Sequence, residues 1–257
     1  MKSTLKNILK QAANPSRFNV MAGKVTSRLF ENNSKAKIQV NLSWIQENLE
    51  CYETYASKIN PAIWLESKAI GTDIAKRAED VLREIEYDLG GGAIYTFLYF
   101  IIRFTQPLNV VETGVAAGFS SYAILAALEK NKKGKLYSSD FPYFRLPNPE
   151  KYIGVIVPED LKKGWSLFIE GDEKNLPKIL NKVDSINLFH YDSDKSYTGR
   201  KKALAMVSNK LSQAPIILMD DIQDNSHFHD MVKDMNREDW HIFEFKGKYV
   251  GMIGKLA

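Results

Sequence analysis

The pattern of apolar positions changes near residue 108. Before this point apolar residues recur every three or four positions, which is the spacing of helices with one buried face. After it, short apolar runs alternate with segments of helical spacing. The pattern therefore predicts helices in the first part of the chain and alternating strands and helices in the second.

Three helices are predicted in the first part. One carries Ile45, Tyr52 and Ile59 on a single face, with Ser43 as the start of a capping box. The next has its apolar face between Ile74 and Leu89, and three glycines follow it. The apolar run 93–104 predicts a third, mostly buried helix.

The second part predicts an α/β fold. Strands that alternate with helices form a parallel sheet covered on both faces, and a closing hairpin adds an antiparallel strand. We therefore expect a Rossmann-like, doubly wound, mostly parallel seven-stranded sheet. The long segment 141–164 is expected to be a loop, either a lid or an ordinary surface excursion. The predicted strands are 109–114, 135–140, 165–172, 186–192 and 214–221, with helices at 119–130, 176–180, 197–211 and 228–235 and hairpin strands at 241–245 and 249–254.

Composition and charge narrow the class of protein. The net charge of +4, from 35 basic and 31 acidic residues, is mild and does not favour a nucleic-acid partner. The longest apolar run, 93–104, includes Arg103 and is shorter than the roughly 20 residues that a membrane span needs. The single cysteine, Cys51, excludes an internal disulfide and suits the cytoplasm. The N-terminal helices are a candidate surface for a homo-oligomer.

Acidic residues and glycines gather where the predicted strands end. Ligands bind parallel sheets beyond the carboxyl ends of the strands, at the point where strand order reverses. Gly114 and Gly118 flank the turn after the first strand, and the following helix N-terminus suits an anion. An ordinary strand-to-helix turn would carry the same two glycines. Asp140, at the end of the next strand, could accept the hydroxyls of a ribose, as acids in NAD sites do.

The segment VVETGVAAGFSS, residues 110–121, resembles the first motif of class I methyltransferases. It is closest to the form of catechol O-methyltransferase and its relatives. The resemblance divides the chain into an extension, 1–89, and an S-adenosylmethionine-binding domain, 90–257. In that family the glycine loop holds the methionine part of the cofactor, the next acid holds the ribose and a third lies near the adenine. The cofactor-binding residues implied are Glu112, Gly114, Gly118, Ser120, Asp140 and Asp172.

Three further carboxylates end neighbouring strands. Asp192, Asp220 and Asp221 would repel one another unless a cation lay between them. Oxygen ligands of this kind suit Mg²⁺, Mn²⁺ or Ca²⁺. Taken alone, Asp192 or Asp221 would more readily be explained as a helix cap. Metal-dependent O-methyltransferases carry acids at these positions, so the resemblance implies a metal site.

Lys195 is the candidate general base. HYDSDKSY resembles the segment IDGDHSY of a bacterial group that includes sugar and antibiotic-tailoring methyltransferases. That group has histidine where this chain has Lys195, whereas catechol O-methyltransferase has a catalytic lysine at the same offset from the acid, here Asp192. The resemblance thus implies that Asp192 and Lys195 are catalytic. Outside this cluster we expect His190 in the core, His227 and His229 at the surface, and residues 200–202 on a solvated helix face.

These features together predict a metal-dependent methyltransferase that acts on a hydroxyl of a small molecule or sugar. One alternative is a nicotinamide-dependent oxidoreductase on a similar sheet, for which the spacing GxGxxG is missing. Another is a non-catalytic adenosyl-binding or scaffold protein, since the long helical extension could build an interface.

Overall fold

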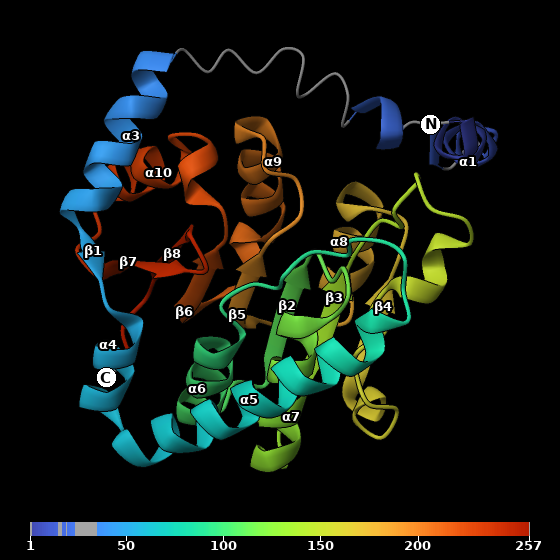
Figure 1. Cartoon of the computed structure of the whole chain (residues 1–257). Helices are drawn as coiled ribbons and strands as arrows, with labels where there is room; N and C mark the ends of the chain where they lie inside the picture. The colour runs from blue at the N-terminus through green and yellow to red at the C-terminus, as the bar shows by residue number, and fades with distance from the viewer. Residues whose placement is uncertain (1, 15–16, 19, 24–34, 257) are drawn as a thin grey trace.

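The computed structural model describes residues 2–14, 17–18, 20–23 and 35–256 (Figure 1). A single eight-stranded sheet has the order β1-β7-β8-β6-β5-β2-β3-β4. Neighbouring strands are parallel except at β8, which is antiparallel to β6 and β7. The strands are β1 (Leu49–Glu50), β2 (Asn109–Thr113), β3 (Lys135–Ser139), β4 (Trp165–Phe168), β5 (Ile186–Tyr191), β6 (Leu211–Met219), β7 (Trp240–Phe245) and β8 (Lys248–Ile253).

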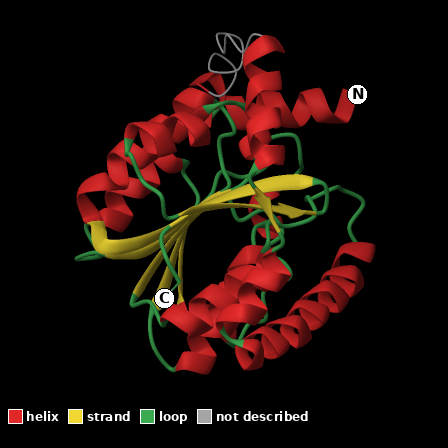
Figure 2. Ribbon diagram, turned by 90° about the vertical axis from the view of Figure 1, so that its left-hand side faces the viewer, coloured by secondary structure: helices red, strands yellow, loops and turns green. Residues whose placement is uncertain are grey.

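Helices cover both faces of this sheet, as Figure 2 shows. Alternate residues of each buried strand face opposite cores: Val110 packs with α4 to α7, whereas its neighbour Val111 packs with α3 and α8 to α10. The predicted doubly wound, mostly parallel sheet is confirmed. The helices are α1 (Lys2–Ala12), α3 (Lys35–Glu47), α4 (Tyr52–Ile59), α5 (Pro61–Arg83), α6 (Tyr95–Thr105), α7 (Phe119–Asn131), α8 (Asp172–Leu180), α9 (Tyr197–Val207) and α10 (His227–Asp234).

The structure corrects the first part of the chain. The helix predicted around Ile45 to Ile59 is interrupted by β1, which adds an eighth strand by pairing with β7 in the register Leu49 to Ile242. Ser43 lies inside α3 and does not begin a helix. This prediction was wrong because β1 is defined by pairing with a strand almost 200 residues later in the chain, and local spacing carries no trace of it.

The helix predicted to reach Leu89 also has different ends. Asn60 begins α5 by accepting a hydrogen bond from the backbone N–H of Ile63 at 2.9 Å, and Pro61 occupies the first helical position. The helix ends at Arg83, before Leu89. The buried α6 is confirmed. No helix in the described ranges combines the length and the apolar character needed to cross a bilayer.

The order of strands reverses beside β2. The chain runs from β2 to β3 and β4 on one side and then returns to β5 on the other side of β2. The carboxyl ends of β2 and β5 therefore border the crevice in which sheets of this kind bind ligands.

Candidate functional site

A cavity of about 580 Å³ opens at this crevice. Its size is ordinary for a small-molecule site. The loops after β2, β3 and β5 and the start of α8 contribute to it, together with side chains from the N-terminal part of the chain. The lining residues are Ile8, Met21, Gly114, Ala116, Asp140, Phe141, Pro142, Tyr143, Phe144, Arg145, Gly171, Asp172, Asp192 and Ser193.

Gly114 allows β2 and β5 to approach each other at the edge of the cavity. Its φ of +83° lies in the region that favours glycine, and a Cβ here would be 2.3 Å from the carbonyl oxygen of Asp192. The predicted glycine thus meets a requirement of packing as well as lining the cavity.

Gly118 faces the segment 154–157. A Cβ on Gly118 would lie 2.8 Å from the Cα of Gly154, whose N–H donates to the carbonyl of Ala116 at 2.9 Å. Ser120 is buried in the first turn of α7, and neither residue is among the described side chains that line the cavity. The predicted contact of Gly118 and Ser120 with a cofactor stays a prediction.

Glu112 lies beneath the glycine loop. It is fully buried on β2 and accepts hydrogen bonds from Ser121 Oγ at 2.6 Å and Ser138 Oγ at 2.7 Å. These bonds join the start of α7 to β3. Glu112 therefore stabilises the position of the glycine loop through these two hydrogen bonds.

The two other predicted cofactor acids line the cavity. Asp140 accepts from the backbone N–H groups of Ala116 at 3.0 Å and Val115 at 3.3 Å, which ties the glycine loop to the end of β3. Asp172 accepts hydrogen bonds from Ser139 Oγ at 2.6 Å and from Ser193 Oγ. Asp172 begins α8, so the strand predicted to reach it was too long: β4 ends at Phe168.

Lys195 joins two of the three clustered carboxylates. Its Nζ pairs with Asp192 Oδ1 and lies 2.9 Å from Asp221 Oδ2. Lys248 Nζ approaches the other oxygen of Asp221 at 3.3 Å. Burial would raise the pKa of Asp221, but Lys195 and Lys248 outweigh it and hold this pKa below its ordinary value.

The third carboxylate faces a different cation. Asp220 Oδ1 lies 3.6 Å from His190 Nε2, and Glu112 Oε1 lies 3.6 Å from His190 Nδ1. Burial disfavours the imidazolium, yet Asp220 and Glu112 raise the pKa of His190 to about 9. His190 is fully buried in the core, as predicted.

The predicted metal ligands do not converge as a set. Lys195 lies between Asp192 and Asp221, while Asp220 faces His190. The part of the chain that the structure describes holds no group of three histidine, cysteine or acidic side chains placed to bind a metal ion. The repulsion among the three carboxylates, from which we predicted a metal ion, is offset here by Lys195 and His190.

Arg200 and Asn225 hold the loops that carry this cluster. Arg200 is 1% exposed, and its Nη2 donates to the carbonyl of Asp221 at 2.8 Å. Asn225 Nδ2 donates to the carbonyl of Lys195 at 2.7 Å. The prediction of a solvated face was wrong for Arg200. Its helical spacing with the buried Ala203 and Val207 was the signal for an inward side chain.

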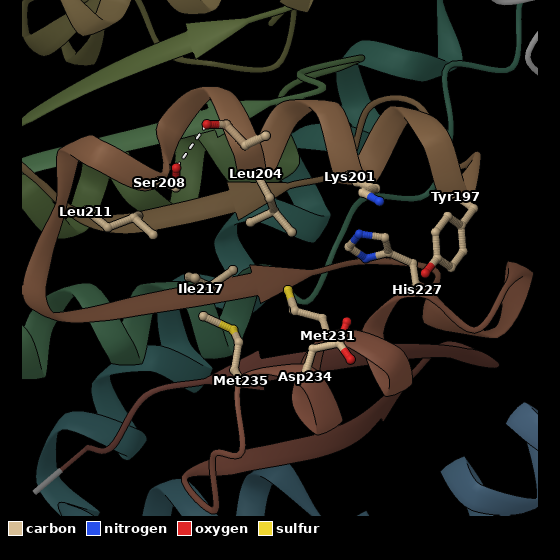
Figure 3. A pocket seen from close by; sticks show the side chains of 11 residues that line it. Tyr197, Lys201, Leu204, Ser208, Leu211, Ile217, His227, Met231, Asp234 and Met235 are labelled. Carbon is tan, nitrogen blue, oxygen red and sulfur yellow. Dashed lines mark hydrogen bonds between the residues drawn. The ribbon is translucent and has the colours of Figure 1, made fainter.

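A second, smaller cavity of about 270 Å³ lies between α9, β6 and α10 (Figure 3). Leu204, Ile217 and Met231 make its wall largely apolar. His227 also lines it and is buried, contrary to its predicted surface position, and burial lowers its pKa to about 4. None of the described strand-end acids lines this cavity, so the larger one is the candidate site.

One protein-family model matches the chain. Residues 111–222, which include the glycine loop and the whole carboxylate cluster, match the family described as methyltransferase domain. The chain has no match among curated proteins.

Several solved methyltransferases have a similar fold. An O-methyltransferase of Streptomyces achromogenes involved in tomaymycin synthesis, solved with S-adenosylmethionine, has a TM-score of 0.53 at 14% identity over 71% of this chain and 89% of that one. An O-methyltransferase of Bacillus cereus, solved with S-adenosylhomocysteine, has a TM-score of 0.51 at 12% identity over 79% and 96%. A methyltransferase of Geobacter sulfurreducens has a TM-score of 0.51 at 15% identity over 71% and 89%.

At these low identities, the similarity to solved structures establishes the fold alone. The family model adds a match to a methyltransferase domain over residues 111–222. The chain thus has this match and the fold of O-methyltransferases that were solved with S-adenosylmethionine or S-adenosylhomocysteine.

Proposed function

We propose that this methyltransferase moves the methyl group of S-adenosylmethionine to a hydroxyl group of a small molecule, a sugar or natural product among them. The observation that carries the proposal is the position of Lys195, whose amino group lies between Asp192 and Asp221 beside the cavity. A base next to a cofactor cavity is what transfer to a hydroxyl requires, since the hydroxyl must lose a proton.

The cavity supplies the groups for the cofactor. Gly114 gives a backbone that a ligand can approach closely, and Asp140 and Asp172 place carboxylates along the same wall. The family resemblance assigns these residues to the methionine, ribose and adenine parts in that order. When bound, the cofactor contributes a methyl group that is already activated by its sulfonium.

Lys195 removes the proton from the acceptor. Burial lowers its pKa, and the attraction of Asp221 and Asp220 offsets this only in part, so the neutral amine is easier to reach than in water. Asp192 and Asp221 orient the amine, and Arg200 fixes the loop of Asp221. Holding the acceptor hydroxyl in line with the methyl group of the cofactor contributes up to about 7–11 kcal/mol of barrier reduction.

No step of the proposed reaction involves a metal ion. Asp192 and Asp221 carry oxygen atoms that suit Mg²⁺, Mn²⁺ or Ca²⁺, but Lys195 lies between them and Asp220 faces His190. The residues in their present arrangement therefore do not fit the predicted three-carboxylate site. A cytoplasmic location, the division at residue 90 and a homo-oligomer formed by the N-terminal helices stay predictions.

Calorimetry and a transfer assay test the proposal in two steps. The chain is titrated with S-adenosylhomocysteine and with NAD, and methyl transfer from labelled S-adenosylmethionine is then measured on a panel of phenols, catechols and sugars with and without EDTA. We expect S-adenosylhomocysteine to bind, NAD not to bind, and transfer to a hydroxyl to survive EDTA. Binding of NAD but not of S-adenosylhomocysteine would overturn the proposal. Binding of S-adenosylhomocysteine without transfer to any hydroxyl would favour an adenosyl-binding protein. Loss of transfer in EDTA would show that the reaction requires a metal ion.

A further inference from the structure

The outer wall of the cavity comes from the beginning of the chain. Ile8 of α1 and Met21 line the same cavity as Asp140 and Asp172. Met21 is 8% exposed although it belongs to neither of the two hydrophobic cores. Val20 packs at the same place: a Cβ added to Gly171 would lie 3.1 Å from Val20 Cγ1.

Polar contacts hold this N-terminal segment, the described residues among 2–23, on the loop that follows β3. Asn7 Nδ2 donates to the carbonyl of Arg145 at 3.1 Å. The guanidinium of Arg17 pairs with Glu150 and also contacts Gln11, which is 8% exposed. Figure 1 shows α1 beside this yellow-green loop, more than 100 residues later in the chain. The contacts fasten the segment at two points around the mouth of the cavity.

The chemistry of this wall suits one part of an adenosyl cofactor. Ile8 and Met21 are apolar, and with Phe141 they line the same cavity as the carboxylates of Asp140 and Asp172. A flat, weakly polar base gains from such surroundings through burial and through contact with a polarizable thioether. Val20 lies against Gly171, which directly precedes Asp172, the acid that the family resemblance places near the adenine.

We propose that the N-terminal segment is part of the cofactor site, with Ile8 and Met21 packing against the adenosine of the bound cofactor. The inference rests on the proposed function and extends it to residues outside the methyltransferase domain.

Calorimetric titration of full-length variants with S-adenosylhomocysteine tests this inference. We expect the double variant Ile8→Ala/Met21→Ala to bind about tenfold more weakly, which equals about 1.4 kcal/mol. Leu9→Ala is the matched control, because Leu9 is 62% exposed on the same helix and does not line the cavity. It should bind as the wild type does.

A charge exchange tests the docking itself. Arg17→Glu and Glu150→Arg should each weaken binding of S-adenosylhomocysteine, and the double exchange should restore it, because the pair can form again with reversed sign. Circular dichroism at the same temperature separates weaker binding from loss of fold.

The outcomes distinguish the two proposals. If the wild type binds S-adenosylhomocysteine and the Ile8→Ala/Met21→Ala variant binds it equally well, this inference is overturned and the proposed function stands. If the wild type binds no S-adenosylhomocysteine, both are overturned. A failure of the double exchange to restore binding contradicts the docking.

Discussion

At the scale of single residues, the proposed function depends most on Lys195. Replacing it by Met keeps much of its shape and removes the base, so we expect methyl transfer to fall by roughly 10²–10⁴-fold. Affinity for S-adenosylhomocysteine should stay within about threefold, since Lys195 does not line the cavity. The control is Lys248→Met, which removes the other lysine beside Asp221 and should cost far less. Equal losses in both variants would contradict a role as base.

The rate of methyl transfer should also rise with pH if Lys195 is the base. The amine accepts a proton only when neutral, so transfer at saturating cofactor should rise with pH. Its midpoint should lie below the ordinary lysine pKa of 10.5, because burial lowers the pKa of Lys195. Rate profiles of the wild type and of Lys195→Met measure this, and a rising limb that persists in the variant would assign it to another group.

His190 should make stability depend on pH. Its pKa rises from 6.5 to about 9 in the folded chain, so the folded state binds the proton more tightly than the unfolded state. The shift corresponds to on the order of 3 kcal/mol. This contribution is fully present below about pH 6.5 and is lost as the pH rises through about 9. Urea unfolding of the wild type and of His190→Asn should show the slope only in the wild type, with His229→Asn as control.

At the scale of elements, the junction of β2 and β5 is the most sensitive point. Gly114→Ala should lower the free energy of unfolding by at least about 1–3 kcal/mol, because the φ is positive and the new Cβ meets Asp192. Gly247→Ala is a matched control, since Gly247 has a φ of +77° with nothing within 4 Å of the added Cβ. Thermal unfolding of both variants separates the clash from backbone strain. Similar losses would mean that the close approach of the strands is unimportant.

Some helices and strands could be predicted from local sequence patterns alone. The strands β2, β3 and β5 and the helices α6 and α7 were predicted within two residues, because an apolar run beside a glycine or proline is a local signal. The boundary of α8 and the interruption at β1 were missed. At β1, two exposed residues form a strand only through a distant partner, and at α8 the acid of the first turn resembles the end of a strand.

At the scale of the whole molecule, the order of strands assembles the site. β2 and β5 are neighbours although β3 and β4 separate them in sequence, and this brings Gly114 to the backbone of Asp192. The N-terminal segment then covers the cavity from outside the sheet. The proposed functional site therefore combines Ile8 and Met21 with the strand ends of residues 111–222.

The sequence by itself determined the fold class, the glycine loop and the acids at the strand ends, because periodicity and strand-end chemistry are local properties. Only the tertiary structure decided how the charges are balanced. Lys195 pairs with Asp192 and Asp221, whereas His190 pairs with Asp220 and Glu112, and spacing along the chain cannot show such partners. The sequence could not show that Ile8 and Met21 line the cavity for the same reason, because the residues around a cavity come from distant parts of the chain.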